Sequence, residues 1–302
     1  MIMSNNKMKH NTRINIDELG DIQSKIIDLL PEGIDAISME DANYHGNVSE
    51  KWVEMNQLKS LHVSEYHKRV LNEAINVVNE NSVVLELGGG VGYDANLFNS
   101  MFSGCKMYIL SDISFKTVTE ARRLSKQDNV KFCLLEASDI KIKDNQVDLI
   151  LIIGAFHHFQ DYDKACSEMS RVAKKGAYIV LGLEPNIVWY KTINLLKPIY
   201  RLFFSKRDHS EADEHMHGFS LKDFEEMATK ANYEIKKIIP SWFFVGFLHY
   251  GNEFIYRLFR LKKRLKIPKT IARLFIFLDD IFFMLPFTKY LGCNYTVIYK
   301  IN

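Results

Sequence analysis

The most constraining feature of this 302-residue chain is a regular alternation of short apolar runs with helical segments between residues 82 and 183. The candidate strands are 82–87, 106–111, 130–135, 147–153 and 176–183. Segments with helical spacing of apolar residues separate them at 93–102, 115–126 and 162–174. Strands that are apolar almost throughout are typical of a parallel sheet with helices on both faces. The pattern therefore predicts an open α/β sandwich.

Further elements flank this region. Apolar residues at helical intervals predict one or two helices within 49–78. The segment from Ser220 to Asp223 has the form of a capping box, which predicts a helix to about residue 231, and a sixth strand follows at 233–239. The β-branched and aromatic run at 293–301 indicates a last strand.

Composition and charge exclude several classes of protein. With 47% apolar and 25% charged residues, the chain does not have the composition of a disordered protein. Its 39 basic and 37 acidic residues give a net charge of +2, so no nucleic-acid partner is expected. The four cysteines form no zinc or disulfide pattern, and the N-terminus lacks the apolar core of a signal peptide. A cytoplasmic protein is expected.

A glycine-rich loop follows the first strand of the alternating region, in VVLELGGGVGYDA at 83–95. A buried strand ends near Glu86, and Gly88, Gly90 and Gly92 then turn the chain into a helix. Glycines at alternate positions allow positive φ and let a ligand lie against the bare backbone. Because ligands of open α/β sheets bind at the carboxyl ends of the strands, this loop is a candidate cofactor site.

Two kinds of cofactor fit such a loop. The run from Gly90 to Ala95 satisfies the dinucleotide pattern Gly-x-Gly-x-x-Ala, and Asp112 stands where the ribose-binding acid of an NAD enzyme would stand. The run from Glu86 to Gly92, however, meets Glu/Asp-x-Gly-x-Gly-x-Gly at every fixed position, and in this the chain resembles the class I S-adenosylmethionine-dependent methyltransferases. Glu86 favours the resemblance, because a carboxylate there suits the methionine ammonium and gains nothing beside a pyrophosphate.

Further motifs follow in the order and spacing of that family. The step SDIS at 111–114 resembles the family's acidic step, which implies that Asp112 accepts the ribose hydroxyls and that Ile113 also contacts the cofactor. Glu136 stands where the family's Asp flanks the adenine, and Ala137 matches the small residue after it. The resemblance thus assigns one residue or more to each part of the cofactor.

The segment IGAFHHFQD at 153–161 resembles the part of the family that follows the fourth strand. There Gly154 and Ala155 would line the cofactor, and His158 matches a frequent histidine. His158, or less directly His157, could take a proton from an attacking hydroxyl. Packing at the start of a helix would explain two adjacent histidines equally well.

The resemblance implies a Rossmann-like doubly wound mixed sheet of about seven strands, the last one antiparallel, with N-terminal and C-terminal helical cap insertions. It also implies an enzyme with S-adenosyl-L-methionine as its cofactor. The methyl group would pass by in-line displacement to an oxygen or nitrogen of a small-molecule, sugar, glycan or lipid-linked acceptor. The expected units are an N-terminal helical cap (1–75), a cofactor-binding core (76–184), a helical and loop insertion (185–218), a continuation of the core (219–240), a basic amphipathic helical insertion (241–287) and the final strand (288–302).

Three residues outside these motifs are candidate substrate contacts, namely Tyr66 on a predicted N-terminal helix and His215 and His217 in a polar loop. Helix packing would explain Tyr66 equally well, and a solvated loop would explain both histidines. Acidic residues beside the histidines supply enough ligand atoms for a metal ion. No metal is nevertheless expected, because the whole loop is polar.

The segment 257–273 has eight Lys and Arg and no acidic residue, interleaved with apolar residues. This pattern predicts a basic amphipathic helix, which is typical of peripheral contact with an anionic membrane surface. The alternative is a packed helical cap with a solvated basic face.

Two other functions stay open on the sequence alone. An NAD(P)-dependent oxidoreductase would bind its cofactor in the same glycine loop. A non-catalytic protein that binds S-adenosylmethionine, or that only scaffolds a complex, would keep the same fold.

Overall fold

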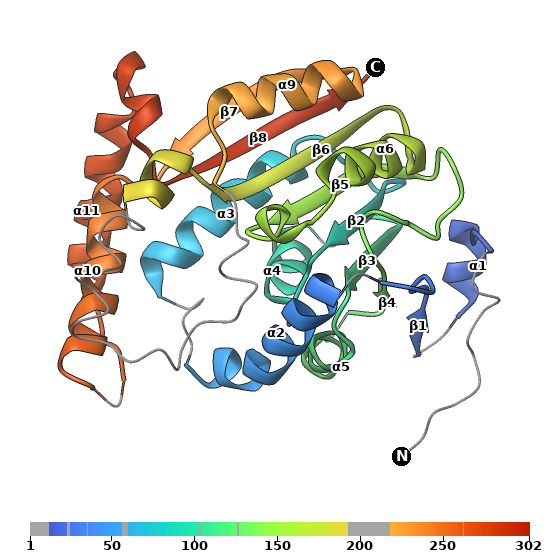
Figure 1. Ribbon diagram of the computed structural model, residues 1–302, viewed down its shortest axis with the longest axis horizontal. Coiled ribbons are helices and arrows are strands. Elements are labelled where there is room, and N and C mark those ends of the chain that lie inside the picture. Colours follow the sequence, from blue (N-terminus) through green and yellow to red (C-terminus); the bar gives the residue numbers. More distant parts are fainter. Residues whose placement is uncertain are drawn as a thin grey trace.

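The computed structural model describes residues 12–22, 25–34, 36–55, 60–102, 104–125, 127–192, 218–261 and 263–302. Within these residues one sheet has the strand order β1-β4-β3-β2-β5-β6-β8-β7 (Figure 1). The strands are β1 (Ile26–Asp28), β2 (Val83–Leu87), β3 (Met107–Asp112), β4 (Val130–Leu134), β5 (Val147–Ile153), β6 (Ala173–Pro185), β7 (Tyr233–Ser241) and β8 (Asn294–Ile301). Neighbours from β1 to β6 run parallel, and β8 runs antiparallel to β6 and β7. The expected mixed sheet with an antiparallel last strand is confirmed.

The sheet has one strand more than the seven that the sequence predicts. The additional strand is β1, which pairs in parallel with β4 through Ile26 to Asp28 at the edge of the sheet. Its three residues are too few to show an alternation or an apolar run that sequence patterns could detect.

Helices cover both faces of the sheet, as expected. They are α1 (Ile16–Asp21), α2 (Ala36–Met55), α3 (Leu61–Ile75), α4 (Tyr93–Met101), α5 (Phe115–Leu124), α6 (Tyr162–Val172), α9 (Leu221–Ala231), α10 (Phe244–Leu258) and α11 (Lys269–Phe282), with short 3₁₀ turns η2 (Phe156–His158) and η4 (Pro286–Leu291). One core cluster joins the sheet to α1, α6 and α9, and a second joins it to α3, α4 and α5 (Figure 1). Successive residues of a strand point to opposite faces of the sheet, so Leu85 belongs to the first cluster and Val84 to the second.

The chain between α10 and α11 corrects one expectation. The predicted basic helix across 257–273 is wrong, because α10 ends at Leu258 and α11 begins only at Lys269. Arg260 has a left-handed φ of +47°, which ends the first helix, and Pro268 caps the second. Proline suits a helix start because it lacks the N–H that a helix interior needs. The C-terminal helical insertion is thus a hairpin of two helices.

This hairpin is anchored to α3 by polar contacts. The Tyr66 hydroxyl donates a hydrogen bond of 2.7 Å to Asp279 of α11, and the Arg69 guanidinium forms two hydrogen bonds with Asp280. The rings of Phe243 and Phe282 stack 4.2 Å apart and join the start of α10 to the end of α11. Among the described residues, none of the helices combines the length and the apolar character needed to cross a membrane.

Candidate functional site

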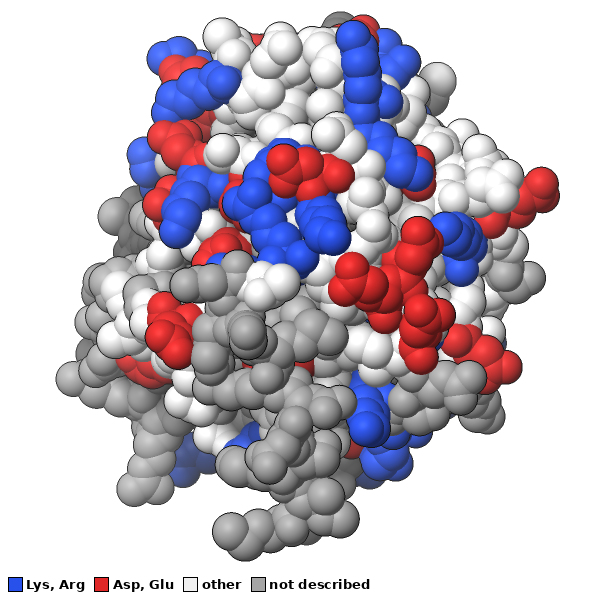
Figure 2. Space-filling model, turned by 90° about the vertical axis from the view of Figure 1, so that its right-hand side faces the viewer, with Lys and Arg blue, Asp and Glu red and all other residues white. Residues whose placement is uncertain are grey.

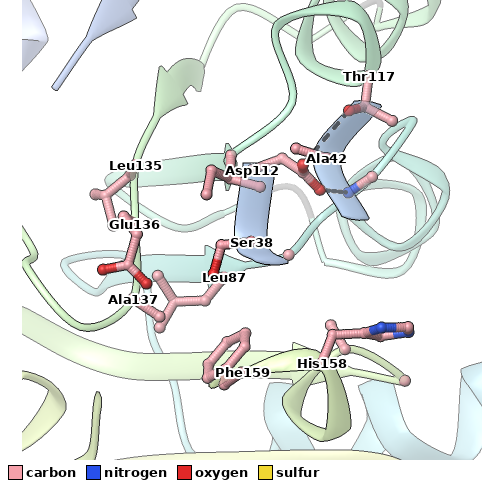
Figure 3. A pocket seen from close by; sticks show the side chains of 15 residues that line it. Ser38, Ala42, Leu87, Asp112, Thr117, Leu135, Glu136, Ala137, His158 and Phe159 are labelled. Carbon is pink, nitrogen blue, oxygen red and sulfur yellow. Dashed lines mark hydrogen bonds between the residues drawn. The ribbon is translucent and has the colours of Figure 1, made fainter. Parts of the chain in front are cut away.

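The carboxyl ends of β2, β3, β4 and β5 meet at one edge of the sheet, and a pocket opens there (Figure 3). Nine of the residues proposed from the sequence line it, eight of them for the cofactor and one for catalysis. These are Gly88, Gly90, Asp112, Ile113, Glu136, Ala137, Gly154, Ala155 and His158. The other lining residues are Ser38, Ala42, Leu87, Thr117, Leu135 and Phe159.

The glycine turn after β2 forms one wall of this pocket. Gly88, Gly90 and Gly92 all have left-handed φ, of +69°, +52° and +76°. A Cβ on Gly88 would stand 2.6 Å from the Cβ of Ala155, so the loop after β5 approaches too closely for a side chain there. Gly92, the N-cap of α4, does not line the pocket, because it faces α5 and β3: a Cβ there would stand 3.1 Å from the side chains of Ala121 and Leu110. A ligand in the pocket can therefore contact bare backbone at Gly88 and Gly90.

Asp112 at the end of β3 faces the glycine turn. Its carboxylate accepts a 3.0 Å hydrogen bond from the Gly90 N–H and a 2.9 Å hydrogen bond from the Ser114 N–H. The Thr117 hydroxyl lies beside the same carboxylate, at 3.4 Å (Figure 3). Asp112 therefore fixes the shape of the glycine turn and also offers a carboxylate to a ligand, which suits paired ribose hydroxyls.

Glu136 occupies a neighbouring wall, after β4. One of its oxygens, Oε2, accepts hydrogen bonds from the Ser138 N–H and hydroxyl, and the N–H distance is 2.7 Å. Leu135 and Ala137 line the pocket on either side of it (Figure 3). A carboxylate between two apolar side chains suits a flat heterocycle that carries an amino group.

Helix α2 covers the pocket from outside the sheet. Ser38 and Ala42 of this helix line the pocket, and Figure 3 shows both of them near Asp112. Further along the helix, a Cβ on Gly46 would stand 2.7 Å from the Ser114 hydroxyl, so α2 packs tightly on the start of α5. The expected N-terminal helical cover is present, but Ser38 and Ala42 belong to the part of α2 that lies ahead of the helical region predicted at 49–78. The proposed contact Tyr66 is not among the lining residues.

Glu86 lies beneath the pocket rather than in its wall. Its side chain is buried, and its Oε2 accepts a 3.0 Å hydrogen bond from the Tyr108 hydroxyl. An ideal Cβ on Gly89 would be 2.9 Å from the same oxygen, which places the carboxyl directly under the glycine turn. Burial, followed by the charges of Asp94 and Asp112, raises the pKa of Glu86 to about 8.

The raised pKa of Glu86 predicts a pH dependence of stability. Between about pH 4.5 and pH 8 the folded chain keeps a proton that the unfolded chain has lost, so the free energy of unfolding falls as pH rises. We expect Glu86→Gln to remove this slope. The free energy of unfolding of the variant relative to the wild type should therefore be higher at pH 8 than at pH 5, by on the order of 3 kcal/mol. Urea unfolding of the ligand-free protein at both pH values measures it, and equal slopes in the two proteins would contradict it.

The loop after β5 carries the histidines and is held by Glu184 of β6. Glu184 is fully buried and accepts hydrogen bonds from the N–H groups of Ala155, Phe156 and His157, at 3.0 to 3.2 Å. The His157 Nδ1 lies 2.9 Å from the same carboxylate, so His157 is directed away from the pocket. His158 lines the pocket, and Figure 3 shows it and Phe159 across the pocket from Asp112. Of the two histidines, only His158 lines the pocket.

Of the three candidate substrate contacts, the structure describes only Tyr66. Tyr66 does not line this pocket, since its hydroxyl is bonded to Asp279 of α11 and its ring packs against Trp242. His215 and His217 lie outside the described residues, as does most of the expected insertion at 185–218.

Sequence reasoning missed several lining residues and the role of Glu184. Leu135 and Phe159 are next in the chain to the predicted residues Glu136 and His158, so their position in the sequence could have indicated that they line the pocket. No motif marked the α2 residues, Thr117 or Glu184. These come to the site only through the packing of α2 on α5 and the pairing of β5 with β6.

The glycine wall yields a prediction with a matched control. Gly90 and Gly33 both have left-handed φ and open space where a Cβ would stand, but only Gly90 lines the pocket. We expect Gly90→Ala and Gly33→Ala each to cost about 1 kcal/mol of stability, because alanine is strained at such φ. Only Gly90→Ala should also lower the affinity for S-adenosylhomocysteine, by about tenfold. Calorimetric titration measures this, and unchanged affinity in Gly90→Ala would contradict the assignment of this wall.

Comparison with known proteins agrees with this geometry. Residues 85–181 match a family model described as a methyltransferase domain. The ubiquinone/menaquinone biosynthesis C-methyltransferase UbiE of Pseudoalteromonas translucida is 29% identical over 151 residues, which are 49% of this chain and 59% of that protein. The chain thus spans less than two thirds of the length of this curated relative.

Two solved structures share the fold. Phosphoethanolamine N-methyltransferase 2 of Haemonchus contortus, solved with S-adenosyl-L-methionine, has a TM-score of 0.57 at 16% identity, covering 90% of this chain and 61% of that chain. A chain from the complex of the Haloferax volcanii Trm112 methyltransferase activator with a methyltransferase has a TM-score of 0.56 at 15% identity, covering 88% of this chain and 97% of that one.

These findings agree with the class that the sequence predicts. Residues 85–181 form a methyltransferase domain of the class I S-adenosylmethionine-dependent type. The matches support an enzyme of this type, with S-adenosylmethionine as its cofactor. The pocket fits that cofactor, since bare glycine backbone, the Asp112 carboxylate and the Glu136 carboxylate follow one another along its walls.

Proposed function

We propose that this chain transfers a methyl group from S-adenosylmethionine to a small-molecule acceptor by in-line displacement. The observation that carries the proposal is the placement of the glycine turn, Asp112 and Glu136 around one pocket at the carboxyl edge of the sheet. The sulfonium of the bound cofactor supplies an activated methyl group, so the protein contributes alignment and exclusion of water.

Each wall has a separate task in this proposal. Asp112 would hold the ribose hydroxyls, and Glu136 would flank the adenine with Ile113 and Ala137. Gly88, Gly90 and Gly154 would lie against the cofactor without side chains. Glu86 would meet the methionine ammonium from beneath the glycine turn rather than as part of the wall. The positive charge of that group would favour the ionised form of a carboxyl whose pKa burial raises to about 8.

His158 is the proposed proton acceptor. It lines the pocket, and its neighbour His157 is fixed by Glu184. An imidazole at this position can take the proton of a hydroxyl or amine as the oxygen or nitrogen attacks the methyl group. We expect His158→Asn to lower kcat about 100-fold or more, while the affinity for S-adenosylhomocysteine changes less than about threefold. Equal losses in both quantities would instead make His158 a cofactor-binding residue.

The acceptor is proposed to be a small molecule, including a sugar, a glycan or a lipid-linked compound, in the cytoplasm or at the inner face of its membrane. The names of similar proteins include a quinone-pathway C-methyltransferase and a phosphoethanolamine N-methyltransferase. These names support a small-molecule acceptor. Methylation of a carbon atom would contradict the proposal that the methyl group passes to oxygen or nitrogen.

The proposal is tested by incubating a cell extract with the protein and a cofactor that carries a deuterated methyl group. Mass spectrometry should detect a labelled small molecule that is absent when the Asp112→Ala variant replaces the wild type. A parallel titration with NADH separates the alternative function: binding of NADH in place of S-adenosylhomocysteine would assign the pocket to an oxidoreductase.

A further inference from the structure

Most of the large apolar side chains that are exposed among the described residues lie in the hairpin of α10 and α11 and in η4. Of the 19 large apolar side chains that are exposed among the described residues, 16 lie between Phe247 and Leu291. Soluble monomers rarely expose apolar patches of this extent, and such patches mark contact with proteins or membranes.

The exposed apolar residues of each helix share one face. In α11 they are Ile271, Leu274, Phe277 and Ile281, at intervals of three and four residues. In α10 they include Phe247, Tyr250, Phe254 and Leu258, again at such intervals. The opposite face of α11, with Ala272, Ile276 and Asp279, is buried. Each helix therefore has an apolar side that stays exposed among the residues that the structure describes.

Basic residues accompany this apolar face. Residues 244–291 hold nine Lys and Arg against three acidic residues, a net charge of +6 in a chain whose total is +2. The acidic side chains are engaged within the protein, since Glu253 pairs with Arg264, Asp279 binds Tyr66 and Asp280 binds Arg69. The exposed basic residues Arg260, Lys263, Lys266, Lys269 and Arg273 lie in and beside the turn between the helices. The opposite end of the molecule instead shows acidic and basic side chains interspersed (Figure 2).

We propose that α10, α11 and η4 form a docking surface for an anionic lipid bilayer, with the apolar faces entering the interface and the basic turn meeting the headgroups. Apolar side chains flanked by Lys and Arg are the composition that binds such interfaces. A second copy of the chain fits less well, because a two-fold contact would bring the same basic turn against itself.

Docking in this way brings the pocket toward the lipid. β7 leads directly into α10, and Asn186, next after β6, bonds through its side chain to the carbonyls of Tyr290 and Gly292 near the end of η4. The hairpin therefore stands at the carboxyl edge of the sheet, which is the edge where the pocket opens (Figure 1). An amphiphilic acceptor held in the bilayer would meet the protein on that side.

Vesicle flotation tests the proposal, with the full chain and without cofactor or acceptor, so that its result is independent of methyl transfer. Wild type should float with vesicles of phosphatidylcholine and phosphatidylglycerol at low salt, and less so at high salt. The variant Lys266→Glu/Lys269→Glu/Arg273→Glu should bind about 100-fold more weakly, since each basic residue near an anionic surface contributes roughly fivefold. The control Lys222→Glu/Lys230→Glu/Lys236→Glu changes the net charge equally on α9 and β7 and should bind as wild type does.

The apolar contribution needs a second variant. Leu274→Gln/Phe277→Gln should lower vesicle binding at least tenfold with the basic residues intact, because two exposed apolar side chains no longer enter the interface. Failure of the wild type to bind anionic vesicles at low salt would overturn the proposal, as would equal losses in the basic variant and its control. A stable dimer in light scattering that Leu274→Gln/Phe277→Gln abolishes, without vesicle binding, would assign the face to a second copy.

Discussion

Asp112→Ala is expected to lower the affinity for S-adenosylhomocysteine at least about 100-fold, the equivalent of two charge-assisted hydrogen bonds. Asp112 lines the pocket and also accepts the N–H groups of Gly90 and Ser114. Its removal therefore deletes the proposed ribose acceptor and frees the glycine turn that it shapes. Isothermal titration calorimetry at constant pH and salt measures the change.

The control for this prediction is Asp163→Ala. Asp163 is an exposed carboxylate on α6 that pairs with Lys230, outside the pocket, so its loss should leave the affinity unchanged. Asp112→Asn should fall between the wild type and Asp112→Ala, because an amide keeps one acceptor oxygen. Near-normal affinity in Asp112→Ala would contradict both the assignment of the ribose subsite and the proposed cofactor.

The sequence predicts the central sheet well because each of its strands has a strong local signal. Strands β2 to β5 are buried on both faces, so their sequences are nearly continuous apolar runs with little ambiguity about their ends. The helix α9 is also marked locally, since Ser220 and Asp223 form the predicted capping box.

The errors fall where a local pattern supports more than one structure. The basic segment at 257–273 has helical amphipathicity, but Pro268 and the left-handed Arg260 divide it into the end of one helix, a turn and the start of another. The helical spacing of apolar residues does not by itself show where a helix is interrupted. The membrane hypothesis survives the correction in a different form, because the apolar faces belong to the two helices and the basic residues to their connection.

The candidate site likewise contains residues whose place the sequence predicts and residues whose place it does not. The residues for the cofactor stand directly after strands and belong to motifs, so the sequence alone predicts that Gly88, Asp112 and Glu136 share one pocket, as they do in the structure. The resemblance did not show that Glu86 is buried under the turn with a raised pKa, since that depends on the nearby Asp94 and on the depth of the core. Nor did it show that Tyr66 serves the hairpin rather than the pocket.

Glu184 is the residue whose importance only the structure shows, and its substitution should have a large effect on stability. It is buried without any exposed surface and accepts three backbone N–H groups and the His157 side chain. Glu184→Gln leaves one acceptor oxygen and places an amide NH₂ against backbone N–H groups that also donate. We expect a loss of about 3 kcal/mol in the free energy of unfolding, measured by urea denaturation.

A purely structural role for Glu184 can be separated from a positioning role. Asp279→Asn is the matched control, because Asp279 is also fully buried and accepts from Tyr66 and from the Phe244 N–H, but it lies outside the pocket. Both variants should lose stability to a similar extent. Only Glu184→Gln should also weaken binding of S-adenosylhomocysteine, by about tenfold, because it releases the loop that carries the Gly154, Ala155 and His158 part of the wall. Equal affinities in the two variants would reduce Glu184 to a stabilising residue of the core.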